Sequence, residues 1–167
     1  MNRLVSLLLS IGLLVGIGCS PKKPEVTSLQ RKEAANLFKE AEFAVTIRDL
    51  PRAVGLLRQA TKLCPDEGDY WLNLGNLTRK AGHVIETKSA YTSALAAYTV
   101  AYKIDKTDSA PLMRQMYVHA LLGETDQAKA TLKKARSAHP KDPRVLKFDE
   151  KALTEMMASP GFKELGI

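Results

Sequence analysis

Trp71-Leu72-Asn73-Leu74-Gly75 places a large aromatic side chain four positions before a glycine. Residues four apart lie on the same face of a helix, so Trp71 and Gly75 would meet a neighbouring helix together. A glycine at that point allows two helices to approach closely, and the indole ring fills the space beside the contact. Alanine, leucine, lysine and glutamate dominate the flanking residues, and this composition predicts helices throughout the body of the chain.

The pattern around this stretch recurs along the chain. Leu37 precedes Trp71 by 34 residues, so two large apolar residues repeat with that period. A set of two alanines and a proline also recurs with the same internal spacing: Ala53, Ala60 and Pro65, then Ala128, Ala135 and Pro140. A period of this length indicates stacked helical repeats, and each proline would end the helix before it.

These residues resemble the signature of the tetratricopeptide repeat (TPR) family, and the resemblance covers residues 34–142. It implies an all-α fold, an antiparallel helix-pair solenoid of three TPR-like repeats plus a C-terminal capping helix. The repeats would span residues 34–67, 68–108 and 109–142, and residues 143–167 would form the capping helix and tail.

The second repeat is expected to contain a longer second helix. Twelve residues separate Gly82 from Ala94, against five between Gly123 and the equivalent Ala128. The excess of seven is two helical turns, which shifts an apolar face by only about 20°. We therefore expect one helix over roughly residues 83–104, about 10 Å longer than its counterparts. Three tyrosines on this helix could form an exposed stripe on the convex side: Tyr91, Tyr98 and Tyr102.

Both ends of the helical region carry boundary signals. Thr27 and Gln30 have the spacing of a capping box, which predicts that the first helix begins near Ser28. At the other end, Arg144–Met157 has apolar residues at helical spacing and is expected to form a single capping helix. Phe162 would then fold back onto that cap.

The N-terminus is predicted to be a bacterial lipoprotein signal peptide, residues 1–18. Leu4–Ile17 is apolar but too short to span the ~30 Å of hydrocarbon comfortably, and small residues precede Cys19. This resembles the lipobox, although Gly16 stands where the family usually has leucine. Cys19 would carry the lipid (acyl chains such as palmitate), and residues 19–33 would form a lipidated tether and helix start. The alternatives are an ordinary signal peptide cut nearby and a retained membrane helix.

The predicted location follows from the same residues. A lipidated Cys19 followed by Ser20 implies the periplasmic face of the outer membrane in a Gram-negative cell. Cys64 would then lack a partner within the chain and be structural and half-buried. The competing interpretation is a disulfide between Cys19 and Cys64.

We find no pattern of catalytic or metal-binding residues. The three histidines, His83, His119 and His139, have no metal-ligand spacing, and no nucleophile or phosphate-loop motif occurs. The chain has 25 basic and 18 acidic residues and a net charge of +7. The basic residues are scattered without aromatic residues between them, which argues against nucleic acid as a partner. The sequence therefore predicts no enzyme activity, no cofactor and no metal.

The remaining prediction is a binding surface. In the family that this chain resembles, the first helix of each repeat lines a concave groove that holds a partner peptide. Carried over to this chain, the groove residues are Phe38, Glu42, Asn73, Asn76, Arg79, Lys80, Met113, Arg114, Tyr117, Arg144, Lys147 and Lys151. Amides, basic groups and aromatic rings would suit an extended segment with acidic groups. The carboxylate-clamp subfamily does not fit, because Phe38, Glu42 and Ala110 stand where it needs Lys, Asn and Lys.

Two functions compete at this point. The favoured one is a membrane-anchored scaffold or assembly factor of the bacterial envelope, resembling pilus-pilotin and outer-membrane assembly lipoproteins. It would bind a protein partner in the cell envelope. The alternative is a lipoprotein that binds the cell wall or an anionic surface through its net positive charge.

Overall fold

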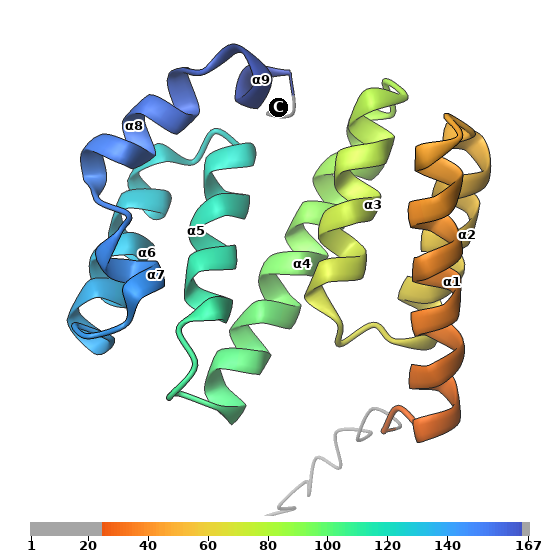
Figure 1. The fold of residues 1–167 in the computed structure, drawn as a ribbon, viewed down its shortest axis with the longest axis horizontal. Helices are drawn as coiled ribbons and strands as arrows, with labels where there is room; N and C mark the ends of the chain where they lie inside the picture. Colours follow the sequence, from red (N-terminus) through yellow and green to blue (C-terminus); the bar gives the residue numbers. More distant parts are fainter. Residues whose placement is uncertain (1–24, 165–167) are drawn as a thin grey trace, which may run out of the picture.

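The computed structural model describes residues 25–164, and this part of the chain is entirely helical (Figure 1). Six longer helices form three consecutive antiparallel pairs, and three shorter ones follow at the C-terminal end. The helices are α1 (Ser28–Thr46), α2 (Leu50–Leu63), α3 (Gly68–Lys80), α4 (Val84–Ile104), α5 (Ala110–Leu121), α6 (Thr125–Ala138), α7 (Pro143–Leu146), α8 (Glu150–Ala158) and α9 (Pro160–Lys163).

Packing follows chain order. The most extensive contacts lie within the pairs α1–α2, α3–α4 and α5–α6, and adjacent pairs meet through α2–α3 and α4–α5. Figure 1 shows the pairs side by side, with α1, α3 and α5 in front of their partners α2, α4 and α6. Each pair thus touches mainly its neighbours, as in a solenoid. The expectation of an all-α helix-pair solenoid is confirmed.

The predicted capping box at the start of α1 is present. The backbone N–H of Gln30 donates to Oγ1 of Thr27 at 3.2 Å, and the backbone N–H of Thr27 donates to Oε1 of Gln30 at 2.9 Å. Two N–H groups that would lack helical partners are thereby satisfied. The helix begins at Ser28, as predicted.

The turns inside the three pairs share one backbone feature. Gly82 and Gly123 have φ angles of 77° and 73°, and Arg48 occupies the same place in the first pair with a φ of 63°. Glycine adopts this left-handed conformation freely, whereas a residue with a Cβ atom is strained there. Arg48 in the first turn is therefore more strained in this backbone conformation than the glycines in the other two turns.

The lengthened helix of the second pair is confirmed. α4 has 21 residues, against 14 each in α2 and α6. The difference is the seven residues inferred from the spacing. Its C-terminal residue Ile104 is highly exposed, which fits a last turn that extends beyond the packed part of the helix.

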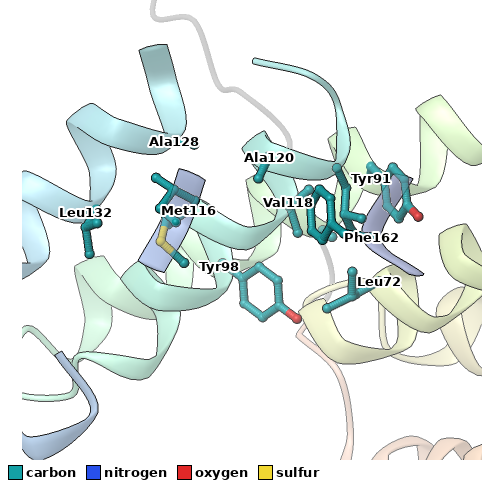
Figure 2. Packing of buried hydrophobic residues seen from close by; sticks show 12 residues of the cluster. Leu72, Tyr91, Tyr98, Met116, Val118, Ala120, Ala128, Leu132 and Phe162 are labelled. Atoms are coloured by element: carbon teal, nitrogen blue, oxygen red, sulfur yellow. The ribbon is translucent and has the colours of Figure 1, made fainter. Parts of the chain in front are cut away.

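The prediction of an exposed tyrosine stripe on α4 is wrong. Tyr91 and Tyr98 are buried, and Tyr102 is half-buried. A Cβ atom at Gly68 would lie 2.5 Å from the ring of Tyr98, and one at Gly75 would overlap the ring of Tyr91. The two rings occupy the space that the glycines leave, so this face of α4 packs inward against α3. Figure 2 shows Tyr91 and Tyr98 among the buried side chains of the largest cluster.

Trp71 joins two parts of the core, as its predicted role between repeats requires. Its side chain packs against both the cluster around α4–α6 and the cluster around α1–α3. The indole N–H donates to the carbonyl oxygen of Pro65 at 3.0 Å, which satisfies its only polar group. The ring is thereby fixed at the junction between the first two pairs.

The single capping helix over Arg144–Met157 is not found, because the segment breaks into α7 and α8. Asp149 caps α8 through a 2.8 Å hydrogen bond from the backbone N–H of Ala152. The guanidinium of Arg136 donates to the carbonyl of Phe148 at 2.9 Å. The cap by Asp149 and the hydrogen bond from Arg136 to the Phe148 carbonyl both stabilise a helix break at this position.

Several predictions concern residues that the structure does not describe. The signal peptide (1–18), the lipid site Cys19 and the proposed Cys19–Cys64 disulfide all involve residues outside the described range 25–164. Within that range no helix is long and apolar enough to cross a membrane. Cys64 forms no disulfide with a residue in that range, and it is fully buried rather than half-buried, which raises the pKa of its thiol.

Candidate functional site

The strongest candidate site is a hollow of about 400 Å³ between the first helices of the first two pairs, which we call the α1–α3 hollow. Five predicted groove residues line it together: Phe38, Glu42, Asn73, Asn76 and Lys80. Its apolar lining comes from residues that the sequence analysis missed: Ala41, Val45, Leu57 and Leu77.

Helical spacing explains why these side chains converge. On α1, Phe38 and Glu42 are four residues apart, and Val45 follows three residues later. On α3, Asn73 and Asn76 are followed by Lys80 with spacings of three and four. Both series therefore lie on one face of their helix, and the two faces line the same hollow. Extending the same spacing would have found Ala41, Val45 and Leu77, whereas Leu57 comes from α2.

The two asparagines are held in place by the protein. Nδ2 of Asn73 donates to the backbone carbonyl of Asp69 at 2.8 Å. The hydroxyl of Tyr91 donates to Oδ1 of Asn76 at 2.9 Å. An amide held through its amino group keeps an acceptor for a partner N–H, and one held through its oxygen keeps a donor for a partner carbonyl. Together they suit the alternating donors and acceptors of a peptide backbone.

The charges at the hollow are of both signs. Glu42 and Lys80 are both exposed, whereas the predicted groove residue Arg79 is half-buried and does not line the hollow. Burial raises the pKa of Tyr91 strongly, so its hydroxyl keeps its proton and remains the donor to Asn76. At neutral pH the hollow is therefore an apolar depression with fixed amides and one charge of each sign on its rim.

The predicted groove residues of the third pair do not line this hollow. Nε of Arg114 lies 3.4 Å from Oδ1 of Asp69, which also accepts a 2.5 Å hydrogen bond from the hydroxyl of Tyr98. Tyr117 packs edge-on against Phe162, and Met113 is half-buried against the core. Arg114 thus already has an acidic partner within the chain, and Tyr117 an aromatic one.

The predicted groove residues near the C-terminus are also placed elsewhere. Arg144 lies at the start of α7 and forms ion pairs with Asp142 at 2.8 Å and Asp108 at 3.0 Å. Hydrogen bonds from Arg144 and from the hydroxyl of Ser109 hold the pKa of Asp142 well below its ordinary value. Lys147 is exposed at the end of α7, and Lys151 lies 3.8 Å from Glu155 on α8. Arg144 thus ties the start of α7 to the loop before α5, and none of the three basic residues lines the α1–α3 hollow.

Each of the three histidines contacts another side chain. Nδ1 of His119 lies 2.6 Å from Glu124, and Nδ1 of His83 lies 3.6 Å from Glu86. His139 packs against the ring of Tyr102 with 6.0 Å between ring centres. Among residues 25–164 no group of three His, Cys, Asp or Glu side chains is arranged to hold a metal ion.

A known protein-family model matches part of the chain. Residues 88–149 match the family model described as tetratricopeptide repeat. No curated protein sequence matches the chain. This segment contains most of α4, all of α5 to α7, and both Gly123 and the second alanine–proline set noted in the sequence.

Solved structures similar to this chain were also found. The first TPR of Spaghetti (RPAP3), bound to an HSP90 peptide, is 11% identical, with a TM-score of 0.48 over 77% of this chain and 96% of that chain. The Arabidopsis OM64 TPR domain is 16% identical, with a TM-score of 0.46 over 77% and 96%. PcrH from Pseudomonas aeruginosa is 18% identical, with a TM-score of 0.46 over 77% and 93%. At these scores the likenesses carry no argument about function.

Proposed function

We propose that this chain is a protein-binding module whose partner docks in the α1–α3 hollow, and the match of residues 88–149 to the tetratricopeptide repeat model supports this role. Repeats of this kind typically serve as scaffolds for protein interactions and not as enzymes, and stacked helix pairs create extended binding surfaces. We propose the same role for this chain, without catalytic activity of its own.

One observation carries the proposal: an apolar depression flanked by two amides whose orientations are already fixed. An extended segment fits this arrangement. Its backbone would exchange hydrogen bonds with Asn73 and Asn76, and one apolar side chain would enter between Phe38 and Leu77. Groups fixed before binding lose little conformational entropy on association, so each contact contributes more to affinity.

The two charged residues at the edge of the hollow, Glu42 and Lys80, determine which charges the partner segment should carry. A carboxylate on the partner could pair with Lys80, whereas Glu42 on the opposite helix would repel it. A partner with an acidic residue on the α3 side and a neutral or basic residue on the α1 side therefore fits best. This requirement also sets the direction in which the segment can lie across the two helices.

The proposal is tested by photo-crosslinking in the native cell. A photoreactive residue at position 42, which is exposed on the hollow, should crosslink a specific partner. The same residue at position 59, exposed on α2 outside the hollow, should not. Equal crosslinking of the same proteins from both positions would contradict binding in the hollow.

A matched pair of charge reversals then tests the rim. Lys80→Glu should weaken binding of the captured partner by about 1–3 kcal/mol through loss of one charged hydrogen bond. Lys62→Glu reverses an equally exposed lysine in the last turn of α2 and should leave binding unchanged. Both variants should keep wild-type helicity by circular dichroism, since exposed substitutions change stability by about 0.5 kcal/mol or less.

We further propose that the module acts in the bacterial envelope, held at the membrane through a lipid on Cys19, as an assembly factor or scaffold. The support is the sequence alone: an apolar segment of limited length followed by small residues and a cysteine. Cys19→Ala should abolish labelling by radioactive palmitate and release the chain from the membrane fraction. Membrane partition equal to that of wild type would refute the lipid anchor, and the crosslinking result would stand independently of it.

A further inference from the structure

The C-terminal helix α9 is joined to the repeats by one aromatic side chain. α9 has four residues, Pro160–Lys163, of which Phe162 is buried while Gly161 and Lys163 are exposed. The ring of Phe162 meets the ring of Tyr117 edge-on, with 5.6 Å between centres and an angle of 81°. Edge-to-face packing of this kind is a favourable aromatic geometry.

The rest of α9 is fixed locally. Ser159 caps it by accepting a 3.3 Å hydrogen bond from the backbone N–H of Phe162, and Pro160 occupies its first turn. Its closest helix neighbour is α8, which directly precedes it in the chain. A helix of one turn gains little stability by itself, so its position depends on the contacts of Phe162.

Core packing connects Phe162 to the candidate binding site. It belongs to the same buried cluster as Leu72, Tyr91 and Val118, from α3, α4 and α5 (Figure 2). The hydroxyl of Tyr91 in turn holds Asn76, which lines the α1–α3 hollow. Figure 1 shows α9 between the upper ends of α5 and α3, on the side of the molecule formed by the first helices of the pairs.

We propose that α9 is a built-in ligand: Phe162 occupies an aromatic-binding position beside Tyr117, and its release exposes that position to an aromatic side chain of a partner. Tyr117 is itself one of the groove residues predicted from the sequence. The release of α9 by a partner rests on the proposed function, whereas the occupancy of the position by α9 does not. A partner that spans both parts would carry an apolar residue for the hollow and an aromatic residue for Tyr117.

The occupancy of this position by Phe162 is tested with a peptide in place of the partner. The probe is the acetylated and amidated peptide of residues 157–164, added to the full chain with Phe162→Ala, in which the position is vacant. Binding is followed by NMR of labelled tyrosine rings, with the Tyr117 signal assigned from a Tyr117→Phe variant. The peptide should shift the Tyr117 signal with an affinity at least tenfold higher in Phe162→Ala than in the wild-type chain. In the wild type the tethered α9 competes at a high effective concentration.

Two controls define the specificity. The same peptide with alanine in place of Phe162 should not bind either chain. The full chain with Phe148→Ala, which alters a different half-buried ring of the same cluster, should bind the wild-type peptide no better than the wild-type chain does. Equal affinity of the peptide for the wild-type and Phe162→Ala chains, or no binding to either, would overturn the proposal.

A measurement on the unaltered sequence covers the case in which Phe162→Ala does not fold. The chain contains four phenylalanines, so incorporation of 4-fluorophenylalanine yields four fluorine signals. The Phe162 signal, assigned with Phe162→Leu, should exchange between a buried and an exposed position, while the Phe148 signal should not. A single Phe162 position without exchange would make α9 a permanent part of the core and refute the proposal. Neither experiment uses a partner, so both can fail while binding in the α1–α3 hollow holds.

Discussion

Replacing Gly75 with alanine should destabilise the chain, although alanine is the better helix former. The perturbation adds one methyl group where α3 and α4 are in closest contact. The added Cβ would overlap the ring of Tyr91, closer than side-chain atoms approach in folded proteins. That ring is fully buried and its hydroxyl is bound to Asn76, so it cannot rotate away without breaking this hydrogen bond.

Two opposing terms set the magnitude. Alanine in a helix interior is favoured over glycine by about 1 kcal/mol. Overpacking of a well-filled core costs typically 1–3 kcal/mol, and the contact here is with the body of an aromatic ring rather than a flexible end. Loss of the hydrogen bond between Tyr91 and Asn76 would add about 1 kcal/mol. We therefore expect a net loss of roughly 1–3 kcal/mol for Gly75→Ala and a larger loss for Gly75→Leu.

Gly55 provides the matched control. It lies inside α2, and a Cβ atom built there meets nothing within 4 Å. Gly55→Ala should therefore stabilise the chain by about 0.5–1 kcal/mol. The measurement is the free energy of unfolding in urea for both variants. If Gly75→Ala were as stable as Gly55→Ala, the close contact between α3 and α4 would not exist as described. Combining Gly75→Ala with Tyr91→Leu should recover part of the loss, because the obstructing ring is gone.

Three further outcomes can be checked by similar means. The folded-state pKa of Asp142 lies below its unfolded value. The stability that Asp142 contributes is therefore complete above about pH 4 and is lost as pH falls further. Asp142→Asn should reduce the acid-induced fall in the urea midpoint, whereas Asp126→Asn at the exposed start of α6 should not. In a chain whose Cys19 is replaced by serine, the buried thiol of Cys64 should react with a thiol reagent only after unfolding, and rapid reaction in the native state would refute its burial. Arg48→Gly should raise the unfolding free energy by about 1 kcal/mol by relieving a positive φ angle, and no change would mean that this turn is unstrained.

The fold was predictable because its determinants are local and repeat. The spacing between Gly82 and Ala94 correctly predicted a helix two turns longer than its counterparts, since an insertion of seven residues preserves the apolar face. The capping box at Thr27 and Gln30 fixed the first helix boundary because both hydrogen bonds form between residues three apart. Such features depend on short stretches of chain and need no knowledge of the tertiary structure.

Features that depend on the neighbour of each helix were predicted less well. Tyr91 and Tyr98 are seven residues apart, which places them on one face of α4 but does not say which face is buried. The buried face of α4 is determined by α3, where Gly68 and Gly75 lie opposite the two rings. The break between α7 and α8 likewise depends on Arg136, a residue of another helix that binds the carbonyl of Phe148.

The candidate site shows the same division between local and tertiary information. Residues one helical turn apart on α1 and α3 were placed on the right faces, so Phe38 and Lys80 meet in one hollow. Which of the polar residues already have partners within the chain could not be predicted, because those partners come from other parts of the chain. Arg114 is neutralised by Asp69 from a different pair, and Tyr117 is covered by Phe162 from the far C-terminus. A group that already has a partner gains less from binding another, because part of its capacity for hydrogen bonds or packing is already used. The α1–α3 hollow is consequently the part of the predicted surface where a partner can bind without first displacing a contact made by the chain itself.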